Sequence, residues 1–256
     1  MAFTSMKLGL RNVGRRRMRA VLTGMMVLLG TFTIVVTKGM QEGSYGEMIN
    51  LATGMWTGDF QVQRKGYHKK PGLNKTVDKS AAVKKQLAGL ADTKEVTGRL
   101  ETSGLLAKGQ KTVGAFIVGV EPIHEAQTTT IAKTVKTGNW LPKGHESAEV
   151  IAAGSVPLPM VLASGIAQQL DAKVGDTVSY MGTAADGTIA AQTFKIVGVM
   201  TTGMDEMDAS LALVRLPELQ QLLVLPGKVH QLIVRLKKRE KVSTVVAKVD
   251  AGKGNV

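Results

Sequence analysis

The sequence predicts an α+β protein in which one membrane-spanning helix near the N-terminus precedes a folded domain. Three observations lead to this prediction: an uncharged apolar run at residues 20–37, a group of cations before it, and mixed strand and helix signals from residue 59 onward. Those later signals follow the order βαββ near residue 60 and βαβα near residue 211, with a polar, strand-rich insertion between them. We therefore expect two related α/β units separated by an insertion.

The apolar run reads AVLTGMMVLLGTFTIVVT and lies between Arg19 and Lys38. A helix of this length spans roughly 27 Å, close to the ~30 Å hydrocarbon core of a bilayer. Residues 20–38 are therefore predicted to be a transmembrane helix. Its small residues Ala20, Gly24 and Gly30 are typical of membrane helices that pack against a neighbouring helix.

Two other interpretations of this apolar run fit the sequence less well. A buried helix of a soluble domain rarely continues so far without a polar face. A cleaved signal peptide has a small-x-small site after its apolar region, whereas the run here continues as TKGMQEGSYGEM. An uncleaved anchor fits better.

Charge predicts the orientation of this helix. The 19 residues before it contain no acid and six cations, which are Lys7, Arg11, Arg15, Arg16, Arg17 and Arg19. By the positive-inside rule these residues remain cytoplasmic, and the chain after Lys38 is exported. Residues 1–19 either form a basic helix along the inner membrane surface or are an unstructured tail, and the sequence leaves both open.

The net charge of +13 invites a nucleic-acid interpretation, but six of these charges belong to residues 1–19. The chain also has few stacking side chains, with three Tyr, five Phe and two Trp, so we expect no nucleic-acid partner. Cysteine is absent, which excludes disulfides and thiolate metal sites and fits an oxidising compartment.

After the predicted span, residues 39–55 are expected to form a stalk that continues the helix. We expect a strand within residues 59–67, a helix at 74–90 and a strand hairpin over 96–122 that turns at 109–111. Residues 121–144 are expected to be polar loops with a short helix. The remaining expectations are strands at 150–153, 192–200, 211–216 and 229–236, a turn leading into a strand at 173–181, helices at 161–170, 217–223 and 242–249, a loop at 201–208, and a hairpin tip at 182–191 containing Asp186-Gly187.

Motifs for catalysis or cofactor binding are not found. The sequence contains no GxxxxGK[ST] and no GxGxxG, so it offers no phosphate-cradling loop. Its four histidines lack metal-ligand spacing, and the acidic group Asp205, Glu206 and Asp208 does not match a calcium loop and reads as an exposed acidic loop. We expect no enzyme activity, no metal and no cofactor in this chain.

The order of these segments resembles the FtsX-like ABC permease family, which includes lipoprotein-releasing and macrolide-exporter permeases with a MacB-like periplasmic core domain. The similarity is closest to the lipoprotein-release (LolC/LolE-like) branch. It covers essentially the whole chain, and no single motif is diagnostic. The stretches that carry it are LGLRNVGRRRMRAVLT, DFQVQRKGY, VLASGIAQQLDAKVGDTV and TTGMDEMDASLALVRLPELQQLL.

The resemblance implies a helix with a stalk followed by a two-lobed extracytoplasmic domain. One lobe would combine residues 56–127 with 204–256, and the other would be the insertion at 128–203. It also implies that the chain is the N-terminal part of a longer permease in the bacterial inner membrane, with its N-terminus cytoplasmic and its main domain periplasmic. Three further membrane helices would follow in the complete permease.

The partners implied by the resemblance are an ABC ATPase subunit that hydrolyses ATP, a second permease subunit (a copy or a paralogue), and a lipoprotein or other hydrophobic substrate. Arg11, Arg15, Arg16, Arg17 and Arg19 would lie near the membrane surface and the ATPase. The hairpin with Thr183, Asp186 and Gly187 is a candidate partner contact, although it is shorter than the carrier-docking hairpin of some lipoprotein-release members.

Two other functions share the same topology. One is a non-transport FtsX-like regulator of a cell-wall hydrolase. The other is a single-pass membrane-anchored adaptor that is complete at 256 residues.

Overall fold

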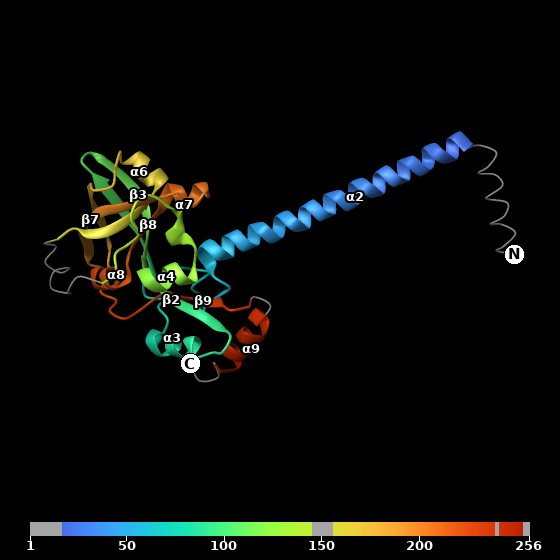
Figure 1. Ribbon diagram of the computed structural model, residues 1–256. Coiled ribbons are helices and arrows are strands. Elements are labelled where there is room, and N and C mark those ends of the chain that lie inside the picture. The colour runs from blue at the N-terminus through green and yellow to red at the C-terminus, as the bar shows by residue number, and fades with distance from the viewer. Residues whose placement is uncertain (1–16, 145–155, 239–240, 253–256) are drawn as a thin grey trace. The chain divides into compact units, whose positions relative to one another are not determined.

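The computed structural model describes residues 17–144, 156–238 and 241–252. The chain divides into two compact units, residues 1–51 and 52–256, which are described separately (Figure 1). The strand expected at residues 150–153 and the predicted site residues Arg11, Arg15 and Arg16 lie outside the described residues.

The first unit contains the long helix α2 (Arg17–Ala52), which includes the whole predicted span. Its segment Arg17–Ser44 is long and apolar enough to cross a membrane, with a mean hydropathy of 2.1. The hydroxyls of Thr23, Thr31 and Thr33 each donate to a carbonyl four residues earlier, at 2.8–2.9 Å. These bonds satisfy the polar side chains within the helix itself, as an apolar surrounding requires.

The helix continues through most of the expected stalk. It ends at Ala52, and a single π-helical turn, η1 (Thr53–Thr57), follows directly along the chain. The predicted continuation of the membrane helix beyond Lys38 is therefore helical as far as Ala52.

The second unit is built around a closed barrel of six strands among the described residues. The pairing runs in the order β2, β3, β8, β5, β7, β6 and returns to β2. The pairs β3–β8 and β5–β7 are parallel and the others antiparallel, so the barrel is mixed. The strands are β2 (Thr93–Lys108), β3 (Lys111–Val120), β5 (Leu158–Ala163), β6 (Thr177–Thr183), β7 (Ile189–Met200) and β8 (Leu211–Arg215).

Three strands extend the sheet beyond the barrel. Strand β9 (Gln231–Leu236) pairs with β2, and β1 (Phe60–Gln63) pairs with β9. On the other side β4 (Val135–Gly138) pairs with β7.

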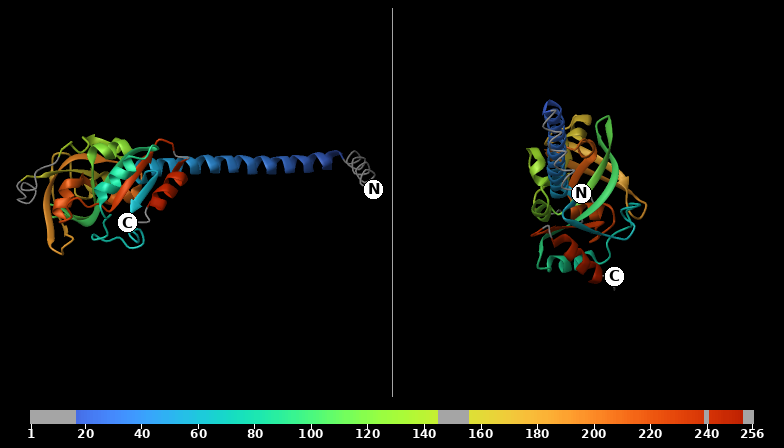
Figure 2. Two further views of the ribbon diagram at one scale, coloured as in Figure 1. Left: turned by 90° about the horizontal axis from the view of Figure 1, so that it is seen from below. Right: turned by 90° about the vertical axis from the view of Figure 1, so that its right-hand side faces the viewer.

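Short helices cover the sheet. In Figures 1 and 2, α3 and α9 lie on the same side of the domain, near the extension formed by β9. The helices are α3 (Ser80–Ala88), α4 (Pro122–Thr128), the 3-10 turn η2 (Ile131–Thr134), α6 (Ser164–Gln169), α7 (Asp205–Ser210), α8 (Leu216–Leu222) and α9 (Val242–Gly252).

Two apolar clusters meet at the barrel wall. In β8, Ala212 and Val214 belong to the larger cluster, whereas Leu211 and Leu213 belong to the second one. The side chains of β5 are distributed between the two clusters in the same alternating way. Successive side chains of a strand point to opposite faces, so these two strands are covered on both sides, and every residue of β8 is buried.

Most of the predicted elements are confirmed. The hairpin β2–β3 turns at Gly109, and the hairpin β6–β7 has Gly187 at its tip with a φ of +87°. The orders β1–α3–β2–β3 and β8–α8–β9–α9 match the two expected α/β segments.

Several expectations were wrong. Strand β4 lies within residues 121–144, which were expected to be polar loops with a short helix, and β7 begins at Ile189, inside the expected hairpin tip. The helix expected at 161–170 begins at Ser164, because residues 161–163 belong to β5 and are buried on both faces. The helix expected from residue 74 begins at Ser80, since Val77 N–H is held by the carbonyl of Val229 at 2.8 Å. The expected loop at 201–208 ends in the short helix α7.

The expected division into two lobes is not shown by the structure. Strands from the expected insertion, residues 128–203, pair with strands on either side of it: β5 with β8, and β6 with β2. Residues 52–256 form one compact unit.

Candidate functional site: the Arg99–Glu125 cluster

The residues predicted from the sequence do not form one site. Arg17 and Arg19 lie in the first turn of α2 with exposed side chains, and Ala20 is half-buried. A Cβ added at Gly24 or Gly30 would meet nothing within 4 Å. Their role in packing against another membrane helix therefore stays a prediction.

The candidate partner-contact hairpin is exposed. Thr183 is the last residue of β6 and pairs with Ile189, whose side chain is 78% exposed. The Asp186 carboxylate accepts hydrogen bonds from the N–H of Thr188 at 2.9 Å and from its hydroxyl at 2.6 Å, and these bonds lower the pKa of Asp186. The tip is therefore an ordered turn, while its contact with a partner stays a prediction.

The structure shows a buried polar cluster that the sequence did not reveal. Arg99 on β2 and Glu125 on α4 are both fully buried. They make two hydrogen bonds, from Nη2 to Oε1 at 2.5 Å and from Nε to Oε2 at 3.1 Å. Such a paired geometry is the strong form of a charge-assisted contact.

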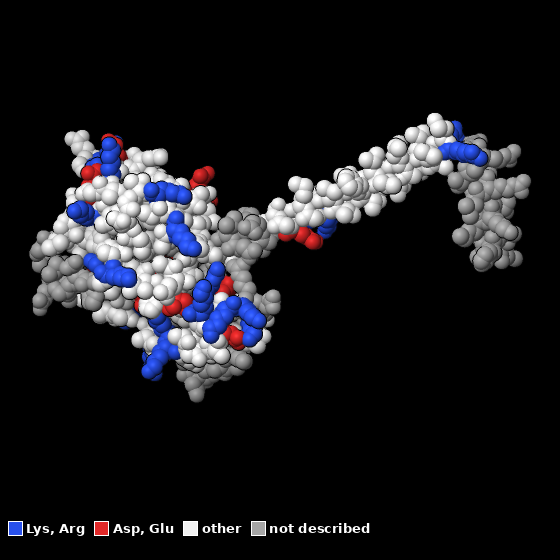
Figure 3. All heavy atoms as spheres, in the orientation of Figure 1, with Lys and Arg blue, Asp and Glu red and all other residues white. Residues whose placement is uncertain are grey.

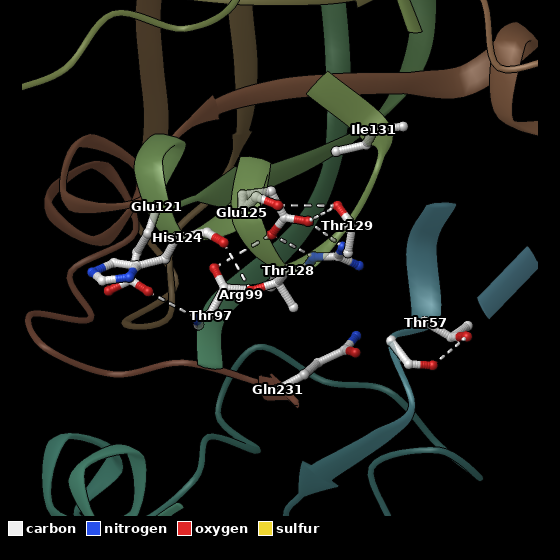
Figure 4. A network of polar contacts seen from close by, with 12 residues as sticks. Thr57, Thr97, Arg99, Glu121, His124, Glu125, Thr128, Thr129, Ile131 and Gln231 are labelled. Carbon is white, nitrogen blue, oxygen red and sulfur yellow. Dashed lines mark hydrogen bonds and ion pairs between the residues drawn. The ribbon is translucent and has the colours of Figure 1, made fainter. Parts of the chain in front are cut away.

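Two hydroxyls complete the hydrogen bonding of this carboxylate (Figure 4). Thr129 donates to Glu125 Oε1 at 2.7 Å, and Thr97 donates to Oε2 at 3.4 Å. A buried charge is tolerated when it is paired and its remaining lone pairs are satisfied. The cluster therefore fixes α4 firmly against β2.

The same arginine holds the turn that follows α2. The guanidinium of Arg99 lies 3.8 Å from the centre of the Trp56 ring in η1. This is a cation–π contact, which strengthens when water is excluded. Its Nη1 makes no hydrogen bond within the described part of the chain, so the Trp56 ring is a main contact of that side of the guanidinium.

Backbone contacts reinforce this attachment. Thr130 N–H donates to the carbonyl of Gly54 at 3.0 Å, and Met55 is buried in the second apolar cluster. After the turn, Asp59 N–H donates to Val234 at 2.9 Å, and an Asp59 carboxylate oxygen accepts from Leu236 N–H at 2.8 Å. Residues 54–59 are thus hydrogen-bonded both to Thr130, in the turn after α4, and to β9.

Gly58 makes this close approach to β9 feasible. Its φ is +67°, and an added Cβ would lie 2.5 Å from a methyl of Ile233 and 2.9 Å from the carbonyl oxygen of Val234. Glycine adopts this backbone conformation without strain.

A second polar cluster holds the loop before α3. His230 is buried, accepts a hydrogen bond from Glu101 N–H through Nδ1 at 3.0 Å, and has Nε2 2.9 Å from the carbonyl of Leu73. These two partners fit the neutral ring with its proton on Nε2. Burial lowers the pKa of His230. Tyr67 donates to Glu101 at 2.7 Å, and burial together with that carboxylate raises the pKa of Tyr67.

Both oxygens of the buried Glu125 carboxylate accept hydrogen bonds from Arg99 and threonines, so the cluster joins α4 to β2. Within residues 17–144, 156–238 and 241–252, no group of three or more His, Cys, Asp or Glu side chains is placed to hold a metal ion.

Sequence reasoning missed Arg99, Glu125 and Trp56. Arg99 lies in β2 within residues 96–100, which are all buried, and Glu125 lies in a short polar helix 26 positions later. Nothing in the local periodicity marks either residue as buried.

Comparison with known families identifies the domain. Residues 20–251 match the model of the MacB-like periplasmic core domain. This chain belongs to that family. The match begins within α2, so the family pattern includes the apolar helix as well as the barrel.

Two solved structures are similar to this chain. The extracellular domain of the noncanonic ABC-type transporter YknZ from Gram-positive bacteria is 12% identical, with a TM-score of 0.46, over 72% of this chain and 86% of that one. The periplasmic region of MacB from Actinobacillus actinomycetemcomitans is also 12% identical, with a TM-score of 0.47, over 74% of this chain and 82% of that one. The comparison with curated proteins found no match.

The MacB-like assignment fixes the broad role of the molecule. It is the periplasmic domain of an FtsX-like ABC transporter permease, in a family whose domain of this type has no catalytic activity. Helix α2 provides one segment with the length and composition of a membrane anchor.

Proposed function

We propose that this chain is the N-terminal part of a permease subunit in a mechanotransmitting ABC transporter that releases lipoproteins from the outer face of the inner membrane. The observation that supports this most directly is the MacB-like family match over residues 20–251, which includes the apolar helix. The substrate class comes from the resemblance of the four sequence segments to the lipoprotein-release branch. ATP is hydrolysed by a separate ATPase subunit, and no cofactor is bound by this chain.

In the proposed mechanism the first membrane helices transmit a movement across the membrane, and the substrate does not cross it. ATP binding brings together two permease subunits, either two copies or a copy and a paralogue, and their first helices shift. Packed elements move as units, so a helix that is continuous over 36 residues can carry this shift outward. The periplasmic domain then moves a lipoprotein that never crosses the inner membrane.

The Arg99–Glu125 cluster supports this mechanism at the point where α2 ends along the chain. Trp56 follows Ala52 by four positions and is held by Arg99, which is itself held by Glu125. We propose that these contacts transmit the helix shift into the barrel. Within the domain we further propose two lobes, residues 56–127 with 204–256 and residues 128–203, that share the barrel strands.

At the cytoplasmic end, Arg11, Arg15, Arg16, Arg17 and Arg19 are proposed to contact the ATPase and lipid headgroups. At the outer end, the hairpin with Thr183, Asp186 and Gly187 is proposed to touch a partner. Both proposals rest on the resemblance and on the exposure of the described residues among them.

The test uses the complete permease pair with its ATPase, reconstituted in lipid nanodiscs. Trp56→Ala should leave ATP turnover within about twofold of the wild type but reduce release of an acylated protein several-fold, because about 1–2 kcal/mol of cation–π contact is lost at the attachment of η1. Trp140→Ala is the matched control. Trp140 is also half-buried, but its Nε1–H donates to the carbonyl of Pro122, and its ring does not contact Arg99.

Equal release by Trp56→Ala and the wild type would overturn the coupling role. The proteins that co-purify with the wild-type complex test the substrate class separately. An acylated protein supports lipoprotein release, whereas a cell-wall hydrolase would identify the complex as a regulator.

A further inference from the structure

A polar cavity of about 520 Å³ lies between the start of β2, the turn from α4 to η2, and β9. Each of these three elements contributes one basic lining residue: β2 contributes Lys94, η2 contributes Lys133 and β9 contributes Arg235. Ala126 is the one apolar residue in its lining, so the cavity is unsuited to an acyl chain.

The positive charge of this cavity exceeds its negative charge. Glu95 is its one acidic lining residue, and Glu95 Oε1 is 2.8 Å from His124 Nδ1. Arg235 Nη1 is 3.6 Å from an Asp59 carboxylate oxygen. The lining therefore carries three cations, Lys94, Lys133 and Arg235, against the single carboxylate of Glu95.

These lysines differ from several others in the domain. Lys84, Lys108 and Lys241 each lie 2.5 Å from a carboxylate oxygen. The side chains of Lys94 and Lys133 make no ion pair or hydrogen bond with any residue that the structure describes. Figure 3 shows Lys and Arg side chains spread over one face of the domain, with fewer acidic side chains among them. Lys94 and Lys133 share their cavity with the guanidinium of Arg235.

We propose that this cavity binds a phosphate group. Cations that outnumber the carboxylates of a cavity attract an anion, and a phosphate offers up to two charges and several acceptor oxygens to cations from different elements. Gln127 and Thr130 in the lining supply further donors. The volume exceeds that of a bare phosphate and leaves room for a substituent such as the glycerol of a lipid headgroup.

This inference does not depend on lipoprotein release, because it concerns the charge of one cavity. The test uses the full chain purified in neutral detergent. Binding is measured by isothermal titration with inorganic phosphate and with water-soluble dihexanoyl phosphatidylglycerol, and dihexanoyl phosphatidylcholine serves as the zwitterionic reference.

The informative variant is Lys94→Gln with Lys133→Gln. Both side chains are exposed, so the fold should be kept, and binding should weaken at least about tenfold because two charge-assisted contacts are lost. The matched control is Lys65→Gln with Lys111→Gln, which removes two exposed lysines outside the cavity and should bind as the wild type does.

Tighter binding of phosphatidylglycerol than of phosphate would identify a lipid headgroup as the source, and equal binding would identify free phosphate. The proposal is overturned if neither ligand binds, if the Lys94/Lys133 variant binds unchanged, or if phosphatidylcholine binds as tightly as phosphatidylglycerol.

Discussion

At the scale of single residues, the domain depends on polar groups that are buried with their partners. Arg99 and Glu125 illustrate the cost of such groups, because each is stable in the interior only while the other is present. Removing one partner leaves an uncompensated buried charge, whereas replacing both with apolar residues of similar volume is often close to neutral. Variants of this pair can therefore separate the effect of buried charge on stability from the effect of packing.

Glu125→Leu should lower the free energy of unfolding by about 3–5 kcal/mol, since it leaves the buried charge of Arg99 without a partner. The double variant Arg99→Met with Glu125→Leu should lower the free energy of unfolding by a clearly smaller amount than Glu125→Leu does. Urea denaturation of the three proteins, followed by tryptophan fluorescence, measures both values. A double variant that is less stable than Glu125→Leu would show that the pair matters for more than mutual neutralisation.

His230 makes the stability depend on pH. Burial lowers its pKa below the ordinary value of 6.5, so below about pH 6.5 the unfolded chain binds a proton that the folded chain does not. Stability is then present above the unfolded pKa and is lost as the pH falls, with a slope approaching about 1.4 kcal/mol per pH unit. The charged groups near the ring matter less, because the Glu101 carboxylate opposes the shift without reversing it.

His230→Gln should flatten this slope between pH 6.5 and 5, since an amide can accept from Glu101 N–H and donate to Leu73 without titrating. Urea denaturation at each pH provides the measurement. His68→Gln, at an exposed position, is the control and should keep the wild-type slope. An unchanged slope in His230→Gln would assign the pH dependence to another group.

At the scale of elements, local signals were sufficient where a turn needs a particular residue. The hairpins at Gly109 and Gly187 were predicted because glycine supplies the positive φ that both turns use. Strand β5 was missed for the opposite reason. Its residues 161–163 fit the apolar spacing of the following helix, and burial on both faces by distant strands decides their conformation instead.

The pairing of β2 with β6 closes the barrel, and it depends on a lack of side chains. Gly104 and Gly182 are direct partners. A Cβ on Gly104 would lie 2.4 Å from the Tyr180 ring and 2.6 Å from the carbonyl oxygen of Met181. The Tyr180 side chain is buried, which raises its pKa, and the backbone oxygen cannot move without disturbing the pair.

Gly104→Ala should therefore destabilise the domain by about 1–3 kcal/mol and speed hydrogen exchange at the amides of Thr177–Thr183. Gly114→Ala is the matched control on β3, where an added Cβ meets nothing within 4 Å. It should leave both quantities near the wild-type values. Exchange mass spectrometry and urea denaturation test the pair, and equal effects of the two substitutions would argue against steric closure.

At the scale of the whole molecule, the sequence predicted the membrane-type helix and the α+β class but not the closed barrel. The helix is a local property of an uncharged run, so composition alone reveals it. Closure requires β2 to meet β6 and β5 to meet β8, which joins residues at least 50 positions apart. No pattern within a single segment specifies such partners. The division into two lobes stays a prediction for the same reason.

The burial of β5 and β8 on both faces has a consequence for how the domain responds to load. Met55, directly after the end of α2, packs in one apolar cluster, and the barrel interior forms the other. The two interiors are separated by the thickness of one strand, and interiors of this kind are as dense as organic crystals and compress very little. A pull applied at Met55 therefore reaches the far wall of the barrel as a displacement instead of being absorbed on the way.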